Sequence, residues 1–125
     1  MIKNLILVGT GGFIGSVARY YLSLIVTKIF PLTFPVGTFT VNILGSFLIG
    51  LIYETTEQYP PLVGARLFLA TGFCGGFTTF SALSLESLSL LEKNEYLLFI
   101  GYVLSSIIIG IISVVLGIQV GKWLG

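Results

Sequence analysis

The sequence predicts an all-helical membrane protein in which four helices span the bilayer and the third is broken near its middle. Of the 125 residues, 55% are hydrophobic and only 9% are charged, whereas about 25% are charged in an ordinary soluble domain. The mean hydropathy is +1.06, and a soluble fold of this size could not bury so much apolar surface. Lipid is therefore the predicted solvent for most of the chain.

The composition also excludes several classes of function. The chain has no His, all five acidic residues are Glu, and the single cysteine is Cys74. One cysteine can form neither an intrachain disulfide nor a cysteine-rich metal site. A net charge of +1 gives no basic surface for a nucleic acid. We expect neither an enzyme nor a nucleic-acid partner.

The first two apolar stretches cover about residues 5–29 and 36–53. Pro31 and Pro35 follow the first stretch, and prolines end helices. The first stretch is too long for the apolar part of a signal peptide, so we expect it to be retained as a span. The second stretch is closed by a polar segment that begins at Glu54.

The last two apolar stretches cover about residues 62–91 and 96–123. A spanning helix needs roughly 20 residues, and the third stretch exceeds this by about ten residues. That excess suits a helix that is interrupted by irregular backbone near residues 75–81. Four spans place both termini on one side of the membrane, within a single domain that covers residues 1–125.

The charges that flank the spans are almost evenly distributed between the two sides. Lys3, Arg66 and Lys122 flank one side, and Lys28 and Lys93 flank the other. Because orientation follows the excess of Lys and Arg on the cytoplasmic side, three against two is nearly no bias. The sequence thus indicates a protein that inserts in either orientation.

Small residues recur at a spacing of four within the apolar stretches. Such stripes let helix backbones approach closely in lipid, which favours a tight bundle or a dimer face. The alternative is the general frequency of glycine in membrane helices. The stripes are Gly11/Gly15, Gly12/Ser16, Ser46/Gly50, Ser106/Gly110 and Ser113/Gly117/Gly121.

Three polar side chains fall inside the apolar stretches: Arg19, Asn42 and Glu86. Arg19 is either a functional charge or a side chain that extends to the nearer membrane surface, and we do not place it in a conduction path. Asn42 must find hydrogen-bond partners in lipid, so it either joins two helices or donates to a polar pathway. Glu86 lies near the polar end of its stretch. It is either a proton carrier or a residue that faces a water-filled vestibule.

The segment from Gly75 to Ser81, Gly-Gly-Phe-Thr-Thr-Phe-Ser, is the predicted break in the third span. Adjacent glycines and threonine hydroxyls disfavour a continuous helix. Broken membrane helices present carbonyls to cations and amides to anions. Phe77 and Phe80 are three residues apart, and so are Ser81 and Ser84. Aromatic edges are electropositive and hydroxyls are donors, so these side chains can solvate a small anion without a fixed charge. The alternative is a flexible kink with packed phenylalanines.

Three segments together carry a resemblance along the whole chain: residues 9–20, 37–47 and 72–81. In this order, within a four-span chain of this length, they resemble the Fluc (CrcB-like) fluoride channel family. The resemblance implies an antiparallel homodimer of oppositely inserted subunits in the plasma membrane of a prokaryote. It also implies passive fluoride export along two pathways at the dimer interface.

The same resemblance implies roles for individual residues. A structural sodium ion would be held at the dimer centre by the backbone carbonyls of Gly75 and Thr78. The implied fluoride pathway consists of Asn42, Phe80, Ser81, Ser84, Tyr102 and Ser106. One departure is Leu83, which stands where the family often has a second pore phenylalanine.

Two other classes of function fit the size of the chain. A proton-coupled small multidrug exporter would need a Glu in its first span, and residues 5–29 contain none. A non-conducting subunit that only packs helices would need neither the break nor Asn42.

Overall fold

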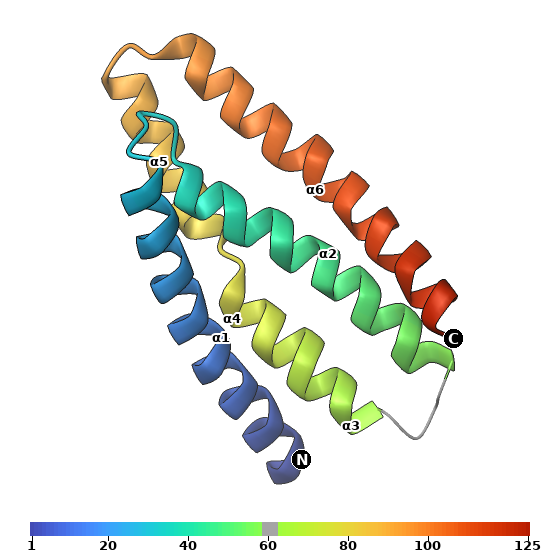
Figure 1. Cartoon of the computed structure of the whole chain (residues 1–125). Helices are drawn as coiled ribbons and strands as arrows, with labels where there is room; N and C mark the ends of the chain where they lie inside the picture. The colour runs from blue at the N-terminus through green and yellow to red at the C-terminus, as the bar shows by residue number, and fades with distance from the viewer. Residues whose placement is uncertain (59–62) are drawn as a thin grey trace.

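The computed structural model describes residues 1–58 and 63–125, and the chain passes up and down a helical bundle four times (Figure 1). Both termini lie at the same end of this bundle. The first, second and fourth passes are α1 (Ile2–Ile29), α2 (Val36–Gln58) and α6 (Tyr96–Leu124). All four passes are long and apolar enough to cross a membrane. The prediction of four long apolar helices is confirmed, and the chain is a membrane protein.

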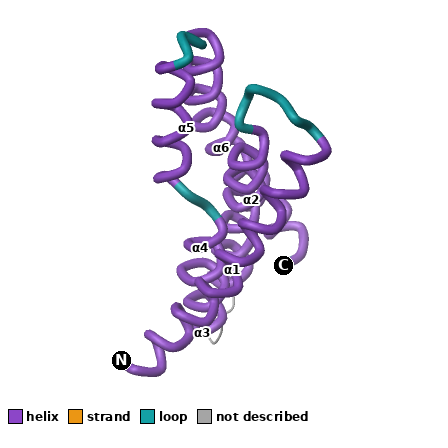
Figure 2. Tube along the Cα trace, turned by 90° about the vertical axis from the view of Figure 1, so that its left-hand side faces the viewer, coloured by secondary structure: helices purple, strands orange, loops and turns teal. Residues whose placement is uncertain are grey.

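The third pass is assembled from four consecutive helical pieces. They are α3 (Val63–Arg66), the π-helix η2 (Leu67–Cys74), α4 (Gly75–Phe77) and α5 (Phe80–Glu92). Between α4 and α5 the backbone is extended at two residues, with φ −93° and ψ 158° at Thr78 and φ −152° and ψ 115° at Thr79. Figure 2 shows this connection partway along the third pass, with α5 continuing beyond it. The predicted bend in the third helix is confirmed.

The second helix continues past its predicted end at residue 53. Thr55 and Thr56 donate their hydroxyls to the carbonyls of Leu51 and Ile52, at 2.9 and 2.6 Å, so these polar side chains satisfy themselves within the helix. Beyond them, Gln58 donates to a carboxylate one turn earlier. Within the described residues the helix extends to Gln58. The predicted start of the third span, residue 62, lies outside the described residues.

Helix α1 packs on the third pass through direct backbone contact. A Cβ at Gly11 would lie 2.9 Å from the amide nitrogen of Phe73, and a Cβ at Gly15 would lie 3.0 Å from that of Phe77. On the facing side, a Cβ at Gly72 would lie 2.9 Å from the carbonyl oxygen of Val8. Only glycine leaves room for these approaches, so the small-residue stripe of α1 fixes the position of the third pass.

Helices α2 and α6 pack side by side along much of their length (Figure 1). Here too glycines make the contact: a Cβ at Gly117 would lie 2.9 Å from the amide nitrogen of Leu51. A Cβ at Gly50 would lie 3.2 Å from the amide nitrogen of Ile118. Helix α2 also contacts η2, α4 and α5 of the third pass (Figure 1), so it lies next to the break.

Candidate functional site

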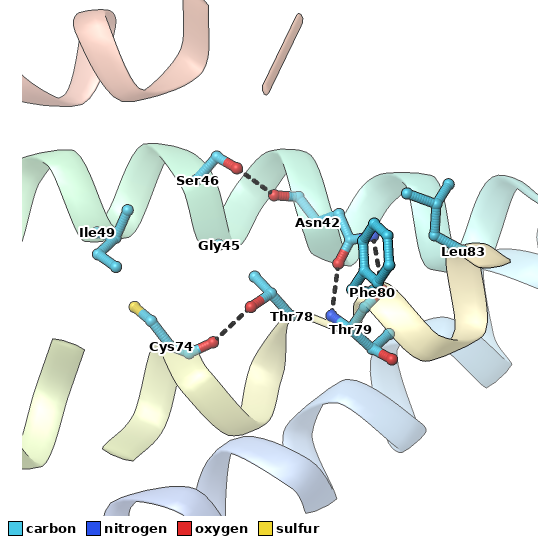
Figure 3. A pocket seen from close by; sticks show the side chains of 9 residues that line it. All are labelled: Asn42, Gly45, Ser46, Ile49, Cys74, Thr78, Thr79, Phe80 and Leu83. Atoms are coloured by element: carbon cyan, nitrogen blue, oxygen red, sulfur yellow. Dashed lines mark hydrogen bonds between the residues drawn. The ribbon is translucent and has the colours of Figure 1, made fainter. Parts of the chain in front are cut away.

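The break is held open by one side chain of α2. The Asn42 Oδ1 accepts a hydrogen bond from the Thr79 backbone N–H at 2.8 Å, and its Nδ2 donates to the Thr79 carbonyl at 3.3 Å (Figure 3). The carboxamide thus pairs with both backbone groups of one residue, as a neighbouring strand would. In a continuous helix the Thr79 N–H would bind the carbonyl of Gly75, four residues earlier. Asn42 takes that donor away.

The Thr79 side chain begins the next helix. Its Oγ1 accepts a hydrogen bond from the Ala82 N–H at 3.1 Å, which is the usual N-cap arrangement. In a continuous helix the Ala82 N–H would bind the carbonyl of Thr78. The Thr79 hydroxyl also lies 3.2 Å from the Ser81 Oγ. Sequence reasoning did not single out Thr79, although a threonine just before a helix start is a recognisable N-cap signal.

The break leaves the carbonyls of Gly75, Phe77 and Thr78 without their helical donors. In a continuous helix the carbonyls of Gly75 and Thr78 would accept from the N–H groups of Thr79 and Ala82. Here those N–H groups donate to Asn42 and to the Thr79 hydroxyl instead. Neither carbonyl accepts a hydrogen bond from the described residues. These are the two oxygens that the family resemblance assigns to a cation. Hard cations prefer such oxygen ligands, so the donors present here fit a sodium ion.

Close packing leaves little freedom on the α2 side of the break. The Thr78 hydroxyl donates to the Cys74 carbonyl at 2.8 Å, which turns its methyl group toward α2. A Cβ at Gly45 would overlap this methyl group and would lie 3.2 Å from the ring of Phe77. On another side, Gly75 is exposed and a Cβ there would meet nothing within 4 Å. One side of the break is therefore packed and the other is open.

A cavity of about 320 Å³ opens beside the break, between α2 and the third pass. Its lining residues are Asn42, Gly45, Ser46, Ile49, Cys74, Thr78, Thr79, Phe80 and Leu83 (Figure 3). None of these lining residues is charged. The Asn42 amide has two N–H donors, and within the described ranges only one of them has an acceptor, the Thr79 carbonyl. A second donor therefore remains available at the cavity.

The predicted aromatic and hydroxyl residues of α5 lie on the open side of the site. Phe80 is the first residue of α5 and is 80% exposed. Ser81 and Ser84 are exposed as well, and the Ser84 hydroxyl donates to the Phe80 carbonyl at 3.0 Å. Leu83 lines the cavity together with Phe80. These side chains form a mixed apolar and polar surface at the start of α5.

A second polar cluster, which we call the Glu86 cluster, consists of Thr38, Glu86 and Tyr102. The Thr38 hydroxyl donates to Glu86 Oε2 at 2.8 Å, and the Tyr102 hydroxyl donates to Oε1 at 2.9 Å. Tyr102 is completely buried. Glu86 also lines a cavity of about 140 Å³ whose lining includes Lys93. The cluster joins α2, α5 and α6 around one carboxylate.

Two further predicted residues line neither of the two cavities described above. Arg19 reaches the break from α1, where its Nε donates to the Gly76 carbonyl at 3.1 Å. Ser106 lies on α6, and its Oγ is buried without a hydrogen-bond partner among the described residues. The structure thus brings Asn42, Thr78 and Phe80 together around one cavity and leaves Ser106 outside it.

Comparison with known proteins adds independent evidence. The family model described as CrcB-like protein, Camphor Resistance (CrcB), matches residues 6–118. Similar proteins named "Fluoride-specific ion channel FluC" occur in Gloeothece citriformis, at 48% identity over 95% of this chain and 97% of the relative, and in Chlorobium chlorochromatii, at 48% over 97% and 94%. A relative of the same name in Bacteroides fragilis is 46% identical over 96% and 97%. The resemblance seen in the three motif segments is confirmed, and the chain belongs to the CrcB-like family.

Proposed function

We propose that the chain conducts fluoride passively across the plasma membrane of a bacterial cell and so lowers cytoplasmic fluoride. The observation that carries this proposal is 46–48% identity, over nearly the whole length, to relatives named fluoride-specific ion channels. Conduction down a gradient requires no catalytic group. The cavity beside the break offers uncharged hydrogen-bond donors of the kind that a fluoride ion needs.

The functional unit is a homodimer, because one subunit leaves polar backbone uncovered at membrane depth. Thr78 is the middle residue of the span Gly64–Glu92. Around it, Gly75 and Ser81 are exposed, and the carbonyls of Gly75, Phe77 and Thr78 lack hydrogen bonds within the described part of the chain. Irregular backbone does not face lipid in membrane proteins. A second copy that places its own break against this one covers the exposed residues and the unpaired carbonyls.

The two subunits are inserted in opposite orientations. Flanking charges number three on one side and two on the other, so the positive-inside rule gives each chain little preference. A two-fold axis in the plane of the membrane then makes the two breaks face each other, because a two-fold interface brings identical surfaces together.

Fluoride is a small, strongly hydrated anion, so a narrow route must replace its water with other donors. The second Asn42 N–H, the edge of the Phe80 ring and the Ser81 hydroxyl provide three such donors near one cavity. None of the lining residues carries a charge, which suits conduction because a fixed cation would hold the anion. Ser84, Tyr102 and Ser106 extend the polar surface along α5 and α6.

The carbonyls of Gly75 and Thr78 from two chains would offer four oxygens to one sodium ion at the dimer centre. A bound cation supplies positive charge that balances the unsatisfied carbonyls and holds the two breaks together. These carbonyls are free to act as ligands because the N–H groups of Thr79 and Ala82 bind Asn42 and the Thr79 hydroxyl instead.

Fluoride efflux from proteoliposomes, followed with a fluoride electrode, tests the function. We expect rapid efflux that is driven by the fluoride gradient alone, with equal pH on both sides. Efflux that depends on a proton gradient, or its absence from reconstituted dimers, would contradict the proposal. Reporter fusions at the C-terminus test the orientation, and a reporter found on one side only would contradict the antiparallel homodimer.

A further inference from the structure

Arg19 makes a contact at the break that none of the roles above explains. Its Nε donates to the carbonyl oxygen of Gly76 at 3.1 Å, across 57 residues of sequence. Gly76 belongs to α4, the last helical piece before the break. No other hydrogen bond of this guanidinium occurs within the described residues.

The break frees the four carbonyls of residues 75–78, because in a continuous helix they would accept from the N–H groups of residues 79–82. Within the described residues, only the Gly76 carbonyl finds another donor, and that donor is Arg19. Arg19 thus takes the place of the Phe80 N–H. Hydrogen bonds from a charged donor are stronger than those between neutral groups, and a cation also interacts favourably with the C-terminal end of a helix.

The sequence register of α1 brings Arg19 to this position. Gly11, Gly15 and Arg19 are four residues apart, so they lie on one face of the helix. The two glycines of this face contact the backbone of η2 and α4. Arg19 is the next member of the same face and reaches the end of α4.

The Gly76 backbone is also packed directly against α1. A Cβ at Gly76 would lie 3.1 Å from the Gly12 Cα and 3.0 Å from the Ser16 Oγ. The Gly76 peptide therefore has close neighbours on α1 and a charged donor at its oxygen. Past the break, the Asn42 pair holds Thr79 to α2. The backbone between Gly76 and Thr79 is fastened at both ends to different helices.

We infer that Arg19 is a positioning residue that anchors the end of α4 to α1 and thereby fixes the carbonyls of Gly75 and Thr78 for a cation. The cation part of this inference rests on the proposed function. The anchoring part rests only on the contact with Gly76. Charge repulsion alone predicts the opposite effect on sodium binding. A fixed positive charge near the site would weaken cation binding, whereas an anchor that positions the carbonyls strengthens it.

Hydrogen exchange of the dimer in detergent tests both parts, with mass spectrometry of peptides that cover residues 73–82. Without sodium, we expect Arg19→Gln to speed exchange at Thr78 and Thr79 about tenfold, as expected when a charged hydrogen bond is lost. With sodium, we expect the concentration that gives half-maximal protection to rise about tenfold for the same reason. Arg19→Lys should restore most of the protection, because an ammonium can donate to the same carbonyl.

Arg66→Gln is the matched control. Arg66 also donates to a backbone carbonyl, that of Tyr53 at 3.2 Å, but it lies away from the break. The control should leave exchange of residues 73–82 and the sodium concentration unchanged. If Arg19→Gln behaves like the control, or if Arg66→Gln changes the sodium concentration equally, the inference is wrong. A lower sodium requirement in Arg19→Gln would also overturn it, because repulsion would then outweigh positioning.

A second measurement uses the wild-type protein and does not depend on the folding of a variant. Arg19 and Arg66 are the two arginines of the chain, so labelling with ¹⁵N-arginine gives two Nε–H signals. We expect slow exchange at Arg19 Nε–H and a shift on sodium addition that Arg66 does not show. Fast exchange at Arg19 would refute the anchor. Slow exchange without any sodium response of the wild type would refute the proposed cation site and leave the anchor standing.

Discussion

Replacing Asn42 by leucine tests the central feature of the site. The two side chains are similar in size, but leucine cannot bond to the Thr79 N–H at 2.8 Å or to its carbonyl at 3.3 Å. Leaving a buried backbone group unpaired costs about 1–3 kcal/mol. Because the groups are partly buried and the second bond is long, we expect the free energy of unfolding to fall by about 2–4 kcal/mol.

The same change should also slow conduction. The Asn42 N–H that has no acceptor within the described residues is a proposed donor to fluoride, and a hydrogen bond to an ion contributes about 1.5–3 kcal/mol. A barrier raised by that amount slows efflux about 10- to 150-fold. Proteoliposome efflux gives the rate, and unfolding by SDS in mixed micelles, followed by far-ultraviolet circular dichroism, gives the stability.

Ser46→Ala is the matched control for Asn42→Leu. Ser46 lines the same cavity one turn later, but among the described residues its hydroxyl binds only the carbonyl of Asn42, within its own helix, at 2.8 Å. Its loss should change stability by less than about 1 kcal/mol. If Asn42→Leu matches Ser46→Ala in both unfolding and efflux, Asn42 neither holds the break open nor donates to fluoride.

Substitutions in α1, α5 and α6 test other contacts of the structure. Gly15→Ala should lower the free energy of unfolding by about 1–3 kcal/mol by overpacking, whereas Gly9→Ala, with nothing within 4 Å of its Cβ, should not; equal SDS unfolding curves would contradict this. Phe80→Ile should slow efflux about tenfold in a protein that remains dimeric by gel filtration, and Leu83→Phe should conduct at least as fast as wild type. Unchanged efflux in Phe80→Ile would exclude the ring from the route. Tyr102→Phe should lower stability by about 1.5–3 kcal/mol, because it removes a donor from the α5 carboxylate at 2.9 Å; an unchanged SDS midpoint would show that this bond contributes little.

The break and its approximate position, residues 75–81, could be predicted from sequence, but the two extended residues and the partner that holds them could not. The two glycines, Gly75 and Gly76, suggested irregular backbone, yet both are helical and the extended residues are Thr78 and Thr79. Glycine only weakens a helix, whereas the interruption requires partners for the freed backbone groups. The main partner is Asn42, 37 residues away, and such long-range pairing leaves no local pattern.

The polar residues within the spans show the same limit. Sequence reasoning left two readings open for Glu86, a proton carrier and a vestibule lining. The structure places two hydroxyl donors on its carboxylate, from Thr38 and Tyr102, which come from helices far apart in sequence. The π-helix η2 was also not predicted, because its apolar composition, Leu67–Cys74, is the same as that of an α-helical span.

The pairing of Asn42 with Thr79 has a consequence for synthesis of the protein. Translation adds about 5–20 residues per second, so Thr79 follows Asn42 after roughly 2–7 seconds. During that interval Asn42 is already in the chain, but the backbone that its carboxamide will bind is not. Until then the Asn42 carboxamide must form hydrogen bonds with a temporary partner, such as water, lipid headgroups or the insertion machinery. The third pass can therefore acquire its break only after it meets α2, so helix association precedes the final shape of the helix.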